Sequence, residues 1–132
     1  MKRTLCAVAI VAAMLVSILP AEGHHSFSAT YNVDRKVTLN GKLVQISLRS
    51  PHSFFYVEVA ESNGMVRRWT IEGGAGGQFA RQGADAFKVG DPVEVIGNPS
   101  RSPNSTRARL IKITRTTDGK SWGTRTGETV GE

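Results

Sequence analysis

The histidines are the residues of this chain with the most evident chemistry. His24 and His25 directly follow a segment that resembles a secretory signal peptide, and His52 follows a Ser-Pro step. Cleavage after Gly23 would make His24 the first residue of the mature protein. A terminal amine, a backbone amide and two imidazoles would then lie at one chain end, and such nitrogen donors suit Cu(II). These residues therefore predict a candidate copper site, with His52 as a further ligand.

Other interpretations of the histidines remain open. Cleavage after Ala21 would instead place His24 third in the mature chain, which is another known arrangement for binding copper. Alternatively, His24 and His25 belong to an unstructured end, and His52 is a hydrogen-bonded loop residue after Pro51. Because protons compete with the metal for each nitrogen, the affinity for copper would decrease as the pH is lowered. No other cofactor is indicated.

The first 23 residues carry the features of a signal peptide. Lys2 and Arg3 precede an apolar run over residues 5–19, and residues 21–23 fit the small-x-small cleavage pattern. The run is shorter than the ~20 apolar residues of a membrane span, although an uncleaved anchor is the alternative. Cys6 is the only cysteine and leaves with the signal, so disulfides are excluded. We expect a periplasmic or secreted protein with no membrane span after cleavage.

The mature chain is long enough for a single domain. Residues 24–115 carry the strand signals, and residues 116–132, rich in Gly, Thr and charge, are expected to form a flexible tail, with the surroundings of Trp122 as the exception. Removal of the signal lowers the net charge from +6 to +5, which could favour an anionic partner, such as a small anionic ligand or an acidic envelope protein. The basic residues are scattered, however, which is typical of a solvated surface.

Alternation of apolar and polar residues predicts an all-β fold. The predicted strands cover residues 37–48, 54–59, 66–72, 92–97 and 107–114. Asn63-Gly64 indicates a hairpin turn, Gly41 indicates a bulge or sharp bend, and residues 78–82 are expected to form one short helix. Five strands with a helix between the third and fourth are the order of a small OB-like β-barrel; an open β-sandwich is the competitor. The expected core is Val57, Val59, Ile71, Val93, Val95 and Ile113.

A second candidate site lies on the predicted third strand. Trp69, Arg67 and Glu72 are weak candidates for ligand binding, because OB barrels stack bases on aromatic residues in a basic groove. Phe54 and Tyr56 alternate with Phe55, so one of these two sets must belong to the core. The predicted export argues against nucleic acid as the physiological partner.

Several short motifs resemble a known family. His24-His25-Ser26-Phe27, Ser50-Pro51-His52, Trp69-Thr70-Ile71-Glu72 and Gly90-Asp91-Pro92-Val93 are similar to landmarks of a group of small exported bacterial proteins of unknown function. Ser50 departs from the Asn that this family usually has, so any role of that amide is in doubt here. The resemblance implies an OB-like fold and an exported location, and it brings no established activity.

No catalytic residues can be assigned from the sequence. The mature chain has no cysteine nucleophile, and neither Ser26 nor Ser53 lies in a nucleophile elbow. We therefore expect an exported, non-enzymatic, OB-like protein that binds a ligand or partner. The alternatives are a copper-binding protein that uses its mature N-terminus, and a structural adaptor for an envelope complex.

Overall fold

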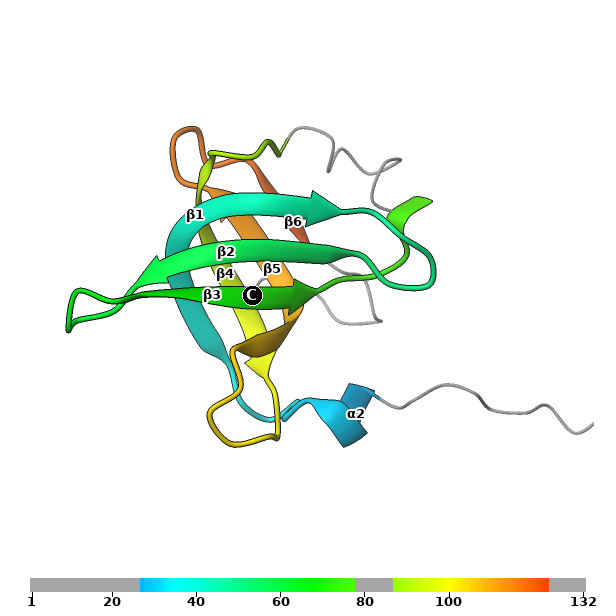
Figure 1. The fold of residues 1–132 in the computed structure, drawn as a ribbon. Helices are drawn as coiled ribbons and strands as arrows, with labels where there is room; N and C mark the ends of the chain where they lie inside the picture. Colours follow the sequence, from blue (N-terminus) through cyan, green and yellow to red (C-terminus); the bar gives the residue numbers. More distant parts are fainter. Residues whose placement is uncertain (1–26, 78–86, 124–132) are drawn as a thin grey trace, which may run out of the picture.

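The computed structural model describes residues 27–77 and 87–123 of the chain. Its elements are α2 (Phe27–Thr30), β1 (Val37–Ser47), β2 (Phe54–Ala60), β3 (Val66–Glu72), β4 (Pro92–Pro99), β5 (Arg107–Arg115) and β6 (Ser121–Gly123). The strands form one sheet in the order β3-β2-β1-β4-β5-β6, and a parallel β3–β5 pairing closes it into a barrel (Figure 1). The predicted small five-stranded OB-like barrel is confirmed. The helix expected at residues 78–82 lies outside the described residues.

Strand β1 serves both sides of the barrel. It pairs with β4 from Val37 to Lys42 and with β2 from Lys42 to Ser47. Gly41 lies at this change of partner, where an added Cβ would approach the Glu58 carbonyl oxygen to 2.2 Å. The β1–β2 register then shifts between Leu43 and Gln45. Of the bulge or bend predicted at Gly41, the structure has the bend there, which requires a residue without a side chain, and the register shift lies farther along the strand.

Alternation along the strands divides the core from the outer surface. The fully buried apolar side chains include Leu43, Phe55, Val57, Ile71, Val93, Val95, Leu110 and Ile113. Five of the six residues expected in the core are in this group, and the sixth, Val59, is partly buried and packs against it. Phe55 belongs to the core, so Phe54 and Tyr56 point to the outside of the barrel.

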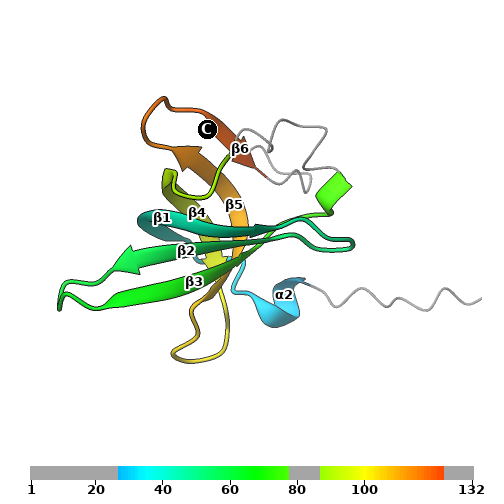
Figure 2. The same ribbon diagram turned by 45° about the horizontal axis from the view of Figure 1, so that its top comes forward.

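The β2–β3 hairpin extends beyond the rest of the barrel (Figures 1 and 2). Gly64 adopts a positive φ of 82° in its turn, which glycine does without strain. The Met65 amide donates a hydrogen bond of 2.9 Å to the side-chain oxygen of Asn63. The Asn-Gly pair therefore closes this hairpin as its sequence predicted.

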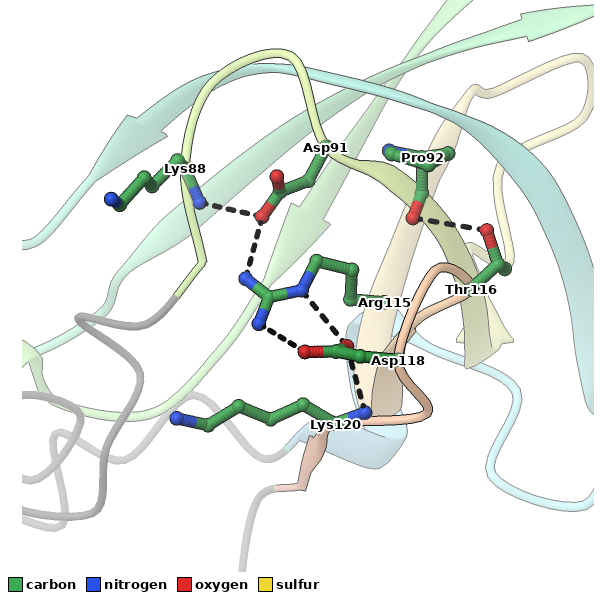
Figure 3. Close-up of polar contacts among 7 residues, drawn as sticks. All are labelled: Lys88, Asp91, Pro92, Arg115, Thr116, Asp118 and Lys120. Carbon is green, nitrogen blue, oxygen red and sulfur yellow. Dashed lines mark hydrogen bonds and ion pairs between the residues drawn. The ribbon is translucent and has the colours of Figure 1, made fainter.

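A sixth strand extends the sheet within the segment expected to be a tail. Trp122 of β6 is buried against the core. Arg115 fixes the hairpin before β6: it contacts Asp118 at 2.6 Å and Asp91, in the turn before β4, at 3.2 Å (Figure 3). The hydrogen bonds from Arg115 lower the pKa of Asp118 to about 2. The stabilisation from this contact is therefore present above the ordinary carboxyl pKa, and it is lost as the pH falls toward 2.

Within the described ranges, no helix is both long and apolar enough to cross a membrane.

The core assignment predicts the effect of two substitutions on one strand. Ile71→Ala should lower the free energy of unfolding by ~2–5 kcal/mol, because Ile71 is fully buried and the change leaves a cavity. Val66→Ala is the matched control, since Val66 is 62% exposed on the same strand and should cost well under ~1 kcal/mol. Denaturant unfolding of both variants measures these values. Equal losses for the two variants would contradict the assignment.

Candidate ligand-binding face

The outer side of the β2–β3 pair carries the side chains that the core excludes. Phe54 and Tyr56 point outward from β2, and Thr70 and Glu72 point outward from β3. In the register of the two strands, Tyr56 lies opposite Thr70, and Phe54 lies opposite Glu72. Both rings are half-buried. This surface, together with Gln45 of β1 and Arg68 of β3, is called the outer face below.

Arg68 is fixed over an aromatic ring in the middle of the outer face. Its guanidinium carbon lies 4.7 Å from the centroid of the Tyr56 ring. Its Nη2 also donates a hydrogen bond of 2.6 Å to Oε1 of Gln45. Three neighbouring strands therefore place a ring, a cation and an amide next to one another. Such a combination can stack against a planar group and bind an adjacent anion.

Glu72 is the centre of a polar cluster at the end of β3. The Tyr31 hydroxyl and Arg107 Nη2 both donate to Oε2 of Glu72, the second at 3.2 Å. Nδ1 of His52 lies 3.4 Å from the other carboxylate oxygen. The Glu72 side chain is only 12% exposed, and Tyr31 is fully buried. The carboxylate is thus held by a neutral phenol and a cation.

Burial changes the acidity of Tyr31. Removal from water raises the pKa of its phenol well above its usual value, and the hydrogen bond to Glu72 and the charge of that carboxylate add to the increase. The neighbouring Arg107 opposes it. Tyr31 therefore remains a neutral donor to Glu72 throughout the physiological range.

The segment before β1 lies against this cluster. The Phe27 ring lies edge-on to the His52 ring at 5.5 Å, and the Arg109 guanidinium carbon lies 4.4 Å from the Phe27 centroid. Arg101, in the β4–β5 loop, donates to the Ser28 carbonyl oxygen at 2.7 Å. The short helix α2 is therefore attached to the barrel from two sides.

The structure separates the three ligand-binding candidates of β3. Arg67 forms an ion pair of 2.7 Å with Glu61 near the turn of the hairpin, and Trp69 packs partly against the core. Both lie on the side of β3 that Ile71 occupies, whereas Glu72 lies on the opposite side. The arginine on the outer face is Arg68, the sequence neighbour of the predicted one.

The metal hypothesis gains no support from the structure. His24 and His25 lie outside the described residues, so their predicted role stays a prediction. In residues 27–77 and 87–123, no group of three His, Cys, Asp or Glu side chains could hold a metal ion. His52 instead contacts Glu72 and Phe27.

Sequence reasoning missed Tyr31, Arg107 and Arg109. Tyr31 precedes the first predicted strand, and no local pattern marks it as buried. The two arginines lie on β5, whose parallel pairing places Arg109 opposite Glu72 and Arg107 opposite Thr70. Only the closure of the barrel brings these residues together. The one signal that could have found them is the predicted barrel itself, because a closed sheet must bring distant strands together.

One protein-family model matches most of this chain. A family of unknown function (DUF6152) matches residues 12–109, which is most of the chain. The chain belongs to this family. The matched range begins before the barrel and ends within β5, so it includes His52, Glu72 and the outer face. A search of curated proteins finds no sequence match.

Three solved structures with a similar fold are single-stranded DNA-binding proteins. A mitochondrial one from S. cerevisiae is 12% identical, with 62% of this chain and 93% of that chain covered and a TM-score of 0.48. The second such protein of Mycobacterium smegmatis is 17% identical, with coverage of 62% and 88% and a TM-score of 0.49. A small one from Streptomyces coelicolor is 18% identical, with coverage of 72% and 96% and a TM-score of 0.39.

The expectation that nucleic acid is not a partner is contradicted by these comparisons, and it is withdrawn. It rested on the predicted export, which does not determine what the surface can bind. The sequence also did not decide which aromatic side chains of β2 lie on the outer surface of the barrel. The structure places Phe55 inside and leaves Phe54 and Tyr56 on the outer face.

The Tyr31–Glu72 hydrogen bond predicts a pH-dependent stability difference. Tyr31→Phe should lower the free energy of unfolding by about 1–3 kcal/mol at pH 7, because Glu72 loses a buried donor. The folded-state pKa of Tyr31 is raised, so its stabilisation is complete below pH ~10 and declines as the pH rises further. Denaturant unfolding should therefore show a smaller difference from wild type near pH 11. A difference that does not change between pH 7 and pH 11 would show that Tyr31 ionises normally.

Proposed function

We propose that this protein is exported, is not an enzyme, and binds single-stranded nucleic acid on its outer face. The observation that carries the proposal is the Arg68 guanidinium held over the Tyr56 ring on the exposed side of β2 and β3. In OB folds, the face formed by strands 2 and 3 is the surface that binds oligonucleotides. The ring provides stacking, and the cation provides charge for the neighbouring phosphate.

The surroundings of Arg68 and Tyr56 suit an extended polyanion. Phe54 lies two residues before Tyr56 on β2, so the two outward rings are spaced by ~6.6 Å along the strand. Arg107 and Arg109 extend the basic character onto β5, and the whole chain has a net charge of +6. Glu72 does not oppose an anion strongly, since Arg107 and Tyr31 already engage its carboxylate. The outward side chains here therefore combine stacking groups with a positive balance, because Lys42, Arg68, Arg107 and Arg109 outnumber Glu58 and Glu72.

The proposal assigns binding rather than catalysis to the face. The Glu72 carboxylate is held by two donors, and Arg68 is held by Gln45 and Tyr56. These contacts orient side chains for recognition. They do not set up a nucleophile with an adjacent base, which covalent catalysis needs.

Export is the part of the proposal that the N-terminal segment supports. The chain produced with its own leader in a bacterial host should be recovered outside the cytoplasm, with an intact mass that corresponds to a start at His24. Recovery of a chain that retains Met1 in the cytoplasm would contradict export. This result would leave the binding face unaffected.

Nucleic-acid binding is tested with a fluorescent oligothymidylate of about eight nucleotides, which is within the ~4–16 nucleotides that OB folds cover. Tyr56→Ala and Arg68→Ala should each weaken binding about tenfold or more, since loss of one stacked base costs ~1–3 kcal/mol. Tyr56→Phe keeps the ring and should retain most of the affinity. The measurement is fluorescence anisotropy at fixed salt concentration.

Arg67→Ala is the matched control for Arg68→Ala. It removes the same charge from the adjacent residue, but Arg67 lies on the other side of β3 and pairs with Glu61. Its effect should be several-fold smaller than that of Arg68→Ala. Equal losses for both variants would reduce the interaction to non-specific charge. Failure of the wild-type protein to bind the oligonucleotide would refute the proposed ligand.

A further inference from the structure

Phe27 lies in an environment built for a planar ring. The guanidinium carbon of Arg109 lies 4.4 Å from its centroid, and the His52 ring meets it edge-on at 5.5 Å with an interplanar angle of 88°. The Tyr31 ring is tilted against it at 6.4 Å. Proteins hold aromatic groups, including nucleobases, by placing a cation over the face of the bound ring and other aromatic rings beside it.

This environment is continuous with the outer face. Arg109 lies opposite Glu72 in the β3–β5 pairing, and Glu72 lies opposite Phe54 in the β2–β3 pairing. His52 precedes Phe54 by two residues and contacts the same Glu72 carboxylate. The rings of Tyr56, Phe54 and His52 therefore follow one another at two-residue intervals, and the Phe27 position lies at the His52 end.

Phe27 is the first residue of α2, and the other end of the helix is attached to the barrel. The helix is a single turn, and its C-terminal side is tied down by the hydrogen bond from Tyr31 to Glu72 and by the Tyr31–Ser100 bridge. The Arg101 amide also donates to the Thr30 carbonyl oxygen at 2.9 Å. These contacts do not involve the Phe27 side chain. Because the Tyr31 amide also donates to the Phe27 carbonyl oxygen at 2.7 Å, the Phe27 ring can leave its position by side-chain rotation without loss of the Tyr31 anchor.

We propose that Arg109 and His52 form a further ring-binding subsite, which Phe27 fills in the free protein and a nucleobase fills when Phe27 is displaced. This inference rests on the proposed function and adds a base position beyond Phe54. The Phe27 ring thus competes with one end of the ligand, and it shortens the length of strand that the free protein can bind.

The test compares wild type with Phe27→Ala, using the oligothymidylate of about eight nucleotides and an abasic oligomer of the same length. Phe27→Ala should bind the oligothymidylate about tenfold more tightly, because one more base can stack. It should bind the abasic oligomer as wild type does, because that oligomer has phosphates and no rings. Phe27→Leu, which keeps an apolar side chain in place, should give a smaller gain and covers the case in which Phe27→Ala disturbs the helix.

A second substitution identifies the subsite itself. Arg109→Lys keeps the positive charge and loses the planar guanidinium that stacks on a ring. In the Phe27→Ala background it should remove the gain in oligothymidylate affinity. Thermal unfolding of each variant shows whether the barrel is intact.

The outcomes separate this inference from the proposed function. Unchanged or weaker oligothymidylate binding by both Phe27 variants, with binding still dependent on Tyr56 and Arg68, overturns the subsite alone. An equal gain with the abasic oligomer also overturns it, since the effect would then be electrostatic. Absence of oligothymidylate binding by wild type and Phe27→Ala overturns both the subsite and the proposed function.

Discussion

The close approach of Gly41 to the Glu58 carbonyl oxygen is the constraint on which the rest of the barrel depends. It allows one strand to leave β4 and join β2 within a few residues, and a Cβ at this position would lie 2.2 Å from that oxygen. Without this bend, β1 would continue as a flat strand, and β3 could not reach β5. The bend thus makes possible the short parallel pairing with β5, which involves Thr70, Ile71 and Glu72 of β3.

Closure of the barrel also decides what the surface can do. Once Phe55 and Ile71 are committed to the interior, strand alternation leaves Tyr56, Phe54 and Glu72 outside. Closure then brings Arg107 from β5 to the Glu72 carboxylate. A negative charge that would repel an anionic ligand is therefore neutralised by the same pairing that completes the core. The pairing that closes the barrel thus also places the arginine that the proposed binding of an anionic ligand requires.

Local patterns predicted the strands well, because alternation, the Asn63-Gly64 turn and Gly41 are readable within a few residues. Contacts between distant segments were harder to predict. Tyr31 and Arg107 carry no local signal, and Trp122 joins the core from a segment whose composition is typical of a tail. Arg67, Trp69 and Glu72 were grouped by proximity in sequence, although alternation places Glu72 on the other side of the strand. The exclusion of nucleic acid failed because it relied on location instead of on surface chemistry.

The most direct test of the account is to map the contact surface residue by residue in solution. Backbone amide resonances of the isotope-labelled protein are followed by NMR while oligothymidylate is added. The shifts should concentrate at Gln45, Tyr56, Arg68 and their neighbours on the outer face, with little change at Asn63 and Gly64 in the hairpin turn. Shifts centred on that turn, or the absence of shifts at saturating oligonucleotide, would contradict the central claim that the Tyr56–Arg68 surface binds the ligand.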